Sequence, residues 1–234
     1  MNKSIIISGL LALASFSSHA GLINSNFETG DLNSWNSLGL ATVDGTIDYG
    51  TAGSISPFDG VNSAHLMSTG ATAAELAILM GITEGTLEDS NGGANATTGS
   101  IIHQSISNVS VGDNFTFSWN FVENDYLPFD DWAFYGISID GGPAEVSKLA
   151  SLGSVGPTIG TTINGWEQVS FDITQAGDYT FYFGIVNAVD MGINSDLWID
   201  GVSIDTTPVP APSTIAIFAL GIIGLAARRF KKNS

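Results

Sequence analysis

Hydrophobic and polar residues alternate with a period of two along much of the middle of the chain. In one run every second position is aromatic, at Phe115, Phe117, Trp119 and Phe121. Alternation of this kind places one face of a β-strand in a core and leaves the other face to solvent. The same pattern predicts further strands over residues 105–111, 132–139, 166–173, 179–186 and 197–204.

Turn-forming residues separate these runs. Gly112 and Asp113 precede one predicted strand, and residues 176–178, Ala-Gly-Asp, precede another. Gly136 interrupts the run over 132–139 and predicts a β-bulge there. Many short strands joined by Gly, Asp and Asn turns are typical of antiparallel sandwiches. The predicted fold class is therefore all-β, an antiparallel β-sandwich of the jelly-roll type.

One segment has a different character. Residues 71–82, ATAAELAILMGI, contain few β-branched residues and predict one short inserted helix. Thr72 is placed to cap its N-terminus, and Glu75 stands three residues later as in a capping box. The following stretch, residues 90–100, is rich in Gly, Asn and Thr and is expected to be a loop.

The N-terminal 20 residues have the three parts of a secretory signal. Lys3 supplies a positive charge, residues 5–16 are apolar, and Ser18-His19-Ala20 is a small-x-small cleavage site. We expect a signal helix that is removed between Ala20 and Gly21. The domain boundaries expected from the sequence are a signal at 1–20, a sandwich at 21–206 and a sorting tail at 207–234.

The C-terminus has a short apolar stretch that ends in basic residues. About 17 residues, 214–230, are long enough to cross a bilayer near the lower limit, which predicts a transmembrane helix. Four basic residues close it and place that end in the cytoplasm, at Arg228, Arg229, Lys231 and Lys232.

A Pro-rich motif, an apolar helix and an Arg-rich end, in this order, resemble the PEP-CTERM sorting signal. The motif here has Ala where the family usually has Glu, and its residues are Pro210, Ala211, Pro212 and Ser213. The resemblance implies export, a transient anchor in the inner membrane, cleavage at this motif by an exosortase-type enzyme, and a final place on the cell surface or outside the cell. A plain membrane anchor is the alternative.

The charge of the body is strongly negative. Between the two ends only Lys148 is basic, and its one positive charge against 23 acidic residues leaves −22. Such a surface repels nucleic acid and anionic lipid and attracts cations. The chain has no cysteine, which excludes disulfides and thiolate chemistry.

Two stretches resemble the opening and closing strands of galactose-binding-like jelly rolls. They are NSNFETGDLNSW at 24–35 and LWIDGVSI at 197–204. The resemblance implies that these strands lie side by side and hold a structural calcium ion through Glu28 and Asp200, with Asp48 and Asp59 completing the site from loops. Calcium prefers six to eight oxygen ligands of this kind. The alternative is that these carboxylates are surface charges at strand ends.

The densest group of functional side chains lies at residues 123–132. It combines carboxylates with aromatic rings, at Glu123, Asp125, Tyr126, Phe129, Asp130, Asp131 and Trp132. Three interpretations stay open: a cation site, a sugar platform on which the rings stack, or a solvated loop with Trp132 in the core.

No catalytic constellation stands out. The two histidines of the body, His65 and His103, lack metal-ligand spacing, and there is no Gly-x-Ser-x-Gly nucleophile elbow. The sequence favours a secreted or surface-attached, non-enzymatic protein that binds carbohydrate or exopolysaccharide in the extracellular matrix. The alternative is a structural matrix protein whose acidic residues are bridged by calcium, and a secreted hydrolase is less favoured.

Overall fold

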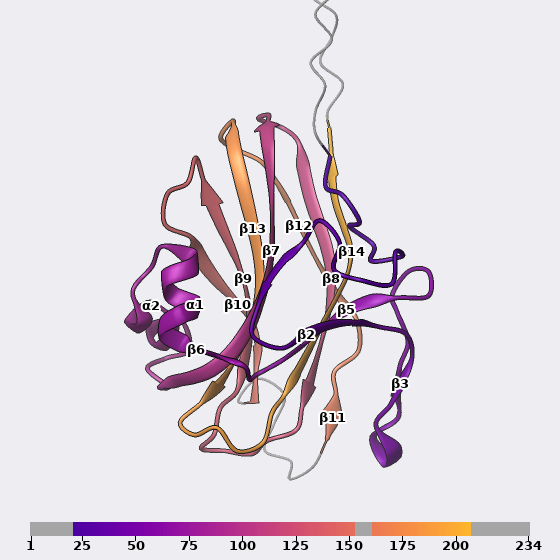
Figure 1. Cartoon of the computed structure of the whole chain (residues 1–234), viewed down its shortest axis with the longest axis vertical. Coiled ribbons are helices and arrows are strands. Elements are labelled where there is room, and N and C mark those ends of the chain that lie inside the picture. The colour runs from indigo at the N-terminus through magenta and orange to yellow at the C-terminus, as the bar shows by residue number, and fades with distance from the viewer. Residues whose placement is uncertain (1–20, 153–160, 207–234) are drawn as a thin grey trace, which may run out of the picture.

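The computed structural model describes residues 21–152 and 161–206, which fold into two facing antiparallel sheets (Figure 1). The predicted signal and transmembrane helices lie outside the described residues. Within those two ranges no helix is long and apolar enough to cross a membrane. The predicted antiparallel sandwich is confirmed.

The first sheet has the strand order β1-β7-β13-β9-β10, and β6 pairs with β7 on the same edge as β1, opposite β13. In that order the strands are Asn36–Leu38, Ala96–Val109, Gly177–Ala188, Trp132–Ile139 and Glu145–Ser151, with β6 at Ala71–Thr72.

The second sheet has the order β11-β8-β14-β5-β2, and β12 also pairs with β8. In that order the strands are Thr162–Ile163, Asn114–Glu123, Asp196–Asp205, Ser63–Met67 and Ala41–Asp44, with β12 at Glu167–Asp172. A small arm made of β3 (Ile47–Asp48), a 3-10 turn (Gly50–Ala52) and β4 (Ser54–Ile55) packs on the outer face of this sheet through Ile55 and Trp198.

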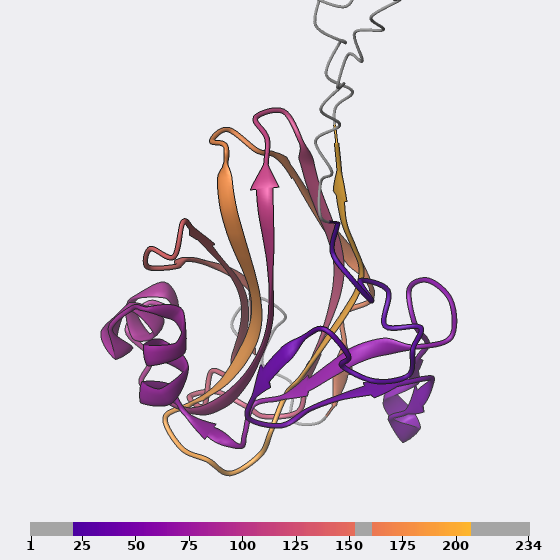
Figure 2. The same cartoon turned by 45° about the horizontal axis from the view of Figure 1, so that its top comes forward.

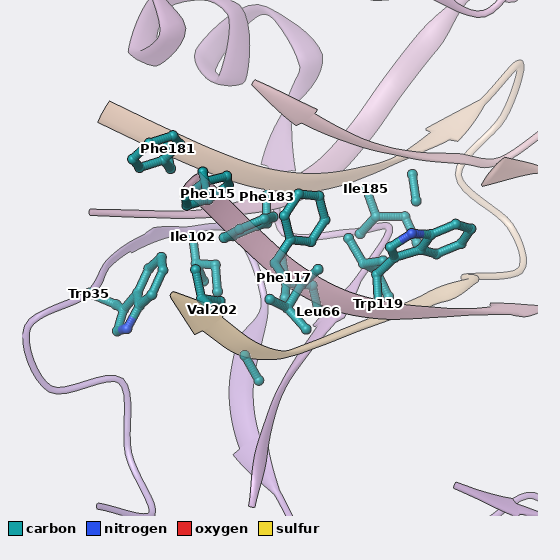
Figure 3. Packing of buried hydrophobic residues seen from close by; sticks show 14 of the residues in the cluster. Trp35, Leu66, Ile102, Phe115, Phe117, Trp119, Phe181, Phe183, Ile185 and Val202 are labelled. Carbon is teal, nitrogen blue, oxygen red and sulfur yellow. The ribbon is translucent and has the colours of Figure 1, made fainter. Parts of the chain in front are cut away.

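The core between the sheets is aromatic (Figure 3). The period-two rings of β8 meet those of β13: the ring centroids of Phe115 and Phe181 lie 3.7 Å apart, and those of Phe117 and Phe183 lie 4.8 Å apart. All four side chains are buried. Because truncating a buried Phe to Ala costs about 3–5 kcal/mol, this row of rings is a main source of the fold's stability.

Two short helices cover the outer face of the first sheet (Figures 1 and 2). The predicted helix is α1, Ala73–Met80, and the predicted capping box is present, with Thr72 and Glu75 bonded to each other's backbone N–H groups. A second helix that the sequence did not predict, α2, spans Glu84–Ser90. The buried face of α1 packs against Trp132 and Phe134 of β9.

Three local expectations were wrong. Residues 96–100 continue β7 and are not part of a loop. Gly136 is in regular register with Tyr182 of β13, so β9 has no bulge there. A Cβ at Gly136 would lie 2.6 Å from Met80 Cε, which shows that the glycine makes room for α1. The segment 24–35 is not a strand, although Ser25 O accepts a hydrogen bond from Val202 N–H of β14.

Candidate functional site

The predicted sorting residues fall at the chain ends. Ala20 and the tail residues lie outside the described residues, the latter being Pro210, Ala211, Pro212, Ser213, Arg228 and Arg229. The described body begins and ends at the same end of the sandwich (Figure 1). The loops 124–131 and 189–195 lie at the opposite end.

The first predicted carboxylate pair converges on one loop, residues 58–62. Asp200 is fully buried, and its two carboxylate oxygens accept hydrogen bonds from Asp59 N–H at 3.0 Å and from Gly201 N–H at 2.7 Å. Burial raises the pKa of Asp200 to about 6, against the backbone hydrogen bonds that lower it. From β14, this side chain therefore fixes the start of the loop.

Glu28 holds the other end of the same loop. Its Oε1 accepts hydrogen bonds from the N–H groups of Val61 and Asn62, both at 2.9 Å. Gly60 lies directly beneath the carboxylate, because a Cβ there would be 2.4 Å from Glu28 Oε1. Glu28 and Asp200, which the resemblance paired, thus both hold loop 58–62 through hydrogen bonds.

These contacts give the calcium prediction no support of their own. The carboxylates face N–H donors, whereas a calcium site supplies oxygen atoms. Asp48 lies on β3, where its Oδ1 accepts a hydrogen bond from Gly50 N–H at 2.8 Å. Within residues 21–152 and 161–206, no three His, Asp or Glu side chains are grouped so that they could hold a metal ion. A calcium ion here stays a prediction.

Three residues of the predicted 123–132 site are fully buried: Glu123, Asp131 and Trp132. Trp132 is packed beneath α1 and α2 on the outer face of the first sheet, so its ring cannot serve as a sugar platform. That part of the prediction is wrong, because even-numbered residues of β9 face the helices. The open alternative that placed Trp132 in a core is the correct one.

Asp131 is a buried residue whose carboxylate connects separate segments of the chain through hydrogen bonds. Its Oδ1 accepts a hydrogen bond from Ala188 N–H at 3.0 Å, and its Oδ2 accepts hydrogen bonds from Ser195 N–H and Ser68 Oγ–H, both at 3.1 Å. These bonds join the start of β9 to the end of β13 and the start of β14. Burial raises the pKa of Asp131 to about 7, in spite of the three hydrogen bonds, and the charge of Asp125 adds to the effect.

Only the tip of this loop reaches solvent. The Tyr126 side chain is 41% exposed, and its ring packs edge-on against the half-buried Phe129 at 5.2 Å between centroids. Asp130 is half-buried, while Asp125 is buried and its raised pKa has burial as the main cause. A sugar platform at this tip therefore stays a prediction for Tyr126 and Phe129 alone.

Both histidines of the body are packed strand residues. His65 lies between two carboxylates, with Nδ1 at 3.0 Å from Asp44 Oδ2 and Nε2 at 3.2 Å from Asp196 Oδ1, and it stacks on Trp198 at 4.2 Å. His103 stacks on Tyr182 at 5.2 Å. Neither histidine lines the cleft between β9–β10 and β12.

The structure has a cleft of about 500 Å³ that the sequence did not point to. It lies between the β9–β10 hairpin of the first sheet and β12 with the loop after it. Half-buried Tyr135, Ile137 and Ile139 of β9 form one side, and half-buried Phe171 of β12 forms the other. The polar residues of its rim are Glu145, Ser147, Asp172, Thr174 and Gln175.

The cleft exists because the two sheets differ in width at this edge. The ring centroids of Tyr135 and Phe171 lie 6.3 Å apart, which puts β12 opposite β9. Beyond β9 the first sheet continues into β10, whose Glu145 and Ser147 are in register with Ile137 and Tyr135 and so share their inward face. In the described part of the chain, β12 is an edge strand that pairs with β8, and no described strand lies opposite the inward face of β10.

Little in the sequence could have revealed this cleft. Phe171 and Ile137 have the spacing of ordinary core positions. One weak signal is that Glu145 and Ser147 are polar at positions that alternate with apolar Val146. Only the strand order shows that they face the same side as the aromatic rings.

Comparison with known families confirms the sorting tail. Residues 208–232 match the PEP-CTERM protein-sorting motif. This motif marks the chain for export and for processing by an exosortase. No curated protein matches the chain.

Several solved structures resemble the body. The carbohydrate-binding module TmCBM61, solved with β-1,4-galactotriose, is 11% identical, covers 80% of this chain and 99% of its own, and has a TM-score of 0.43. The K1 cleaved adhesin domain of Lys-gingipain from Porphyromonas gingivalis W83 is 13% identical over 82% of this chain and 100% of its own, with a TM-score of 0.43. An enzymatically active domain of tailspike protein 4 from bacteriophage CBA120 is 12% identical over 79% of this chain and 21% of its own, also at 0.43. At these scores the likeness carries no argument about ligand or activity.

Proposed function

We propose that this protein is an exported, non-enzymatic carbohydrate-binding protein and that the saccharide lies in the cleft between β9–β10 and β12. The observation that carries the proposal is the aromatic lining of the cleft. Tyr135 and Phe171 come from opposite sheets, their ring planes are inclined by only 24°, and both are half-buried rather than sealed in the core. Rings presented in this way offer a flat apolar surface to the C–H face of a sugar.

The rim supplies the second requirement of sugar recognition. Glu145, Thr174 and Gln175 are exposed around the aromatic lining, and Ser147 is half-buried beside it. Carboxylate, hydroxyl and amide groups can accept hydrogen bonds from sugar hydroxyls or donate to them. An apolar floor with a few convergent polar groups is the usual form of a small-ligand site.

The arrangement of acids supports binding rather than hydrolysis. A glycosidase needs two carboxyl groups about 5–10 Å apart at the scissile bond. Only the Glu145 carboxylate shares the face of the aromatic rings, because Asp172 Oδ1 accepts a hydrogen bond from Asn114 Nδ2 at 2.9 Å on the outer face of β8 and β12. The two carboxyls with pKa values raised to about 6 and about 7, Asp200 and Asp131, are buried and do not line the cleft.

A glycan array with the purified full chain tests this proposal, and it should include polysaccharide from the host. The informative variant is Ser147→Trp, which fills the cleft from β10. Gln168→Trp is the matched control, because Gln168 is exposed on the outer face of β12, on the other side of the strand from Phe171. We expect glycan binding that the first variant abolishes and the control keeps.

Two other results would redirect the proposal. Binding that survives Ser147→Trp but is lost in Tyr126→Ala would move the site to the loop tip at the opposite end of the sandwich. Absence of glycan binding together with calcium-dependent self-association of the chain would favour the structural matrix protein instead. Divalent cations can bridge acidic surfaces that otherwise repel each other, which gives such self-association a physical basis.

A further inference from the structure

The charge around the cleft is of one sign. Among the described residues that line it, the carboxylates are Glu145, on the cleft face, and Asp172, whose side chain lies on the outer face of β12, and none is basic. Asp140, at the end of the same β9–β10 hairpin, adds a negative charge close enough to raise the pKa of Tyr179 on the cleft wall, an effect for which burial is the larger cause. The cleft therefore presents a negative field to its ligand.

No positive group of the body offsets this field. Lys148 is the only basic residue between the two ends of the chain. It alternates with Ser147 along β10 and so faces away from the cleft, and its Nζ donates a hydrogen bond to Asn91 Oδ1 at 3.4 Å. A uronate, sulfate or phosphate group on a saccharide would enter the cleft without a counter-charge and against a body charge of −22.

We propose that the saccharide bound in this cleft is an amino sugar with a free, protonated amine, held between the Glu145 carboxylate and the aromatic rings. This inference rests on the proposed function, since it names the class of sugar for the same site. Tyr135, Phe171 and Tyr179 are the rings that line the cleft. An ammonium group is attracted by the face of such rings and by a neighbouring carboxylate.

The expected preference is moderate because the carboxylate is exposed. An exposed ion pair and a cation–π contact together correspond to about threefold to tenfold in affinity. The preference should weaken as salt is added, because the Debye length shortens to about 8 Å at physiological ionic strength and further above it. A neutral N-acetylated sugar keeps the stacking and hydroxyl contacts and should bind more weakly.

The test is isothermal titration calorimetry of the full chain with three oligosaccharides of equal length: a glucosamine oligomer, its N-acetylated form and a uronic acid oligomer. We expect the glucosamine oligomer to bind several-fold more tightly than the acetylated one, and the uronic acid oligomer not to bind. Glu145→Gln should remove this preference, so that the glucosamine oligomer and the acetylated oligomer bind with similar affinity. Glu84→Gln is the control, since it removes an exposed charge on α2, on the outer side of the first sheet.

Each other outcome overturns the inference. Equal binding of the two amino-sugar forms, or tighter binding of the acetylated one, refutes the cationic ligand and leaves the proposed carbohydrate function intact. A preference that persists in Glu145→Gln shows that this carboxylate does not recognise the amine. A preference that persists in Ser147→Trp shows that the amine is recognised outside the cleft. Binding of the uronic acid oligomer refutes the charge argument. A lack of binding to all three oligosaccharides refutes the inference, and it refutes the function only if the glycan array is negative as well.

Discussion

Asp131→Asn should change how the stability of this protein depends on pH. The carboxyl group of Asp131 is fully buried at the start of β9, and burial raises its pKa to about 7 from an ordinary value of 3.8. Between these two values the folded protein holds a proton that the unfolded chain has released. Folding then takes up a proton, so the free energy of unfolding decreases as pH rises from about 4 to about 7.

The size of the effect follows from the shift. One unit of pKa corresponds to about 1.4 kcal/mol, so a rise of about three units gives up to about 4 kcal/mol across this range. The amide introduced by Asp131→Asn is neutral at every pH and lacks this dependence. The variant also loses one acceptor, because an amide NH₂ replaces the Oδ2 that accepts from Ser195 N–H and Ser68 Oγ–H. Ser195 N–H keeps its second acceptor, Ser68 Oγ at 2.9 Å, which limits the loss at low pH to about 1–3 kcal/mol.

The assay is urea unfolding followed by tryptophan fluorescence at a series of pH values, for the wild type and for Asp131→Asn. General charge repulsion also varies with pH, so the informative quantity is the difference between the two proteins. Asp205→Asn provides the control, since it removes an exposed carboxylate at the end of β14. Asp131→Asn should be less stable than wild type near pH 4. Its free energy of unfolding should rise steadily relative to that of wild type as pH increases toward 7.

Parallel curves for wild type and Asp131→Asn would refute the reasoning. They would mean that Asp131 is ionised in the folded protein at the same pH as in the unfolded chain. In that case the three hydrogen bonds would outweigh the cost of burial, and the group would be a buried carboxylate with no role in the pH dependence of stability.

Three further predictions concern stability. His65→Gln should lower the free energy of unfolding by about 2–4 kcal/mol below the unfolded histidine pKa of about 6.5, because the buried Asp196 and the half-buried Asp44 lose their ion-pair partner. Burial lowers the pKa of His65, but the two carboxylates leave it raised. This contribution is therefore lost as pH rises through the folded pKa, which urea unfolding at several pH values checks. Gly184→Ala should destabilise by about 1–3 kcal/mol in thermal unfolding, because its Cβ would lie 2.3 Å from Phe134 Cζ, and a wild-type melting temperature would contradict this contact. Calcium bound by Glu28 and Asp200, which hold loop 58–62, should raise the melting temperature, and EDTA should reverse the rise. An unchanged melting temperature would contradict this prediction.

The strands that sequence predicted best are those with one face in the core. β8 and β13 carry aromatic residues at every second position, and their predicted spans agree with the structure to within a few residues. Alternation depends only on which face of a strand is buried, so it is visible locally. The cap of α1 was predicted for the same reason, because Thr72 and Glu75 are three residues apart.

The elements that were missed lack this local signal. β5, Ser63–Met67, has only five residues: Ala64 and Leu66 lie in the core, and polar His65 lies on the other face, stacked on Trp198. So short an alternation is a weak signal. No described strand lies opposite β10, and its residues 145–149 are exposed or half-buried on both faces. The helix α2 has seven residues and a single buried side chain, Leu87.

The acidic loop at 123–132 shows where sequence reasoning stops. Its composition left a cation site, a sugar platform and a solvated loop open, and the structure buries Asp131 and Trp132 while Tyr126 is exposed. All three residues lie within seven positions, and turn residues carry no period from which the direction of a side chain could be read. The contacts with residues 188–195 of a distant segment decide which carboxylates are buried.

By itself, the sequence determined the sorting tail, the negative charge of the body and the antiparallel sandwich, because each depends on composition or on short-range periodicity. Only the tertiary structure decided where a ligand can bind. The cleft requires that β10 extend beyond β12, and this follows from the order of strands that are separated by many residues in the chain. Strand order is set by the packing of whole sheets, so no local stretch of sequence contains it.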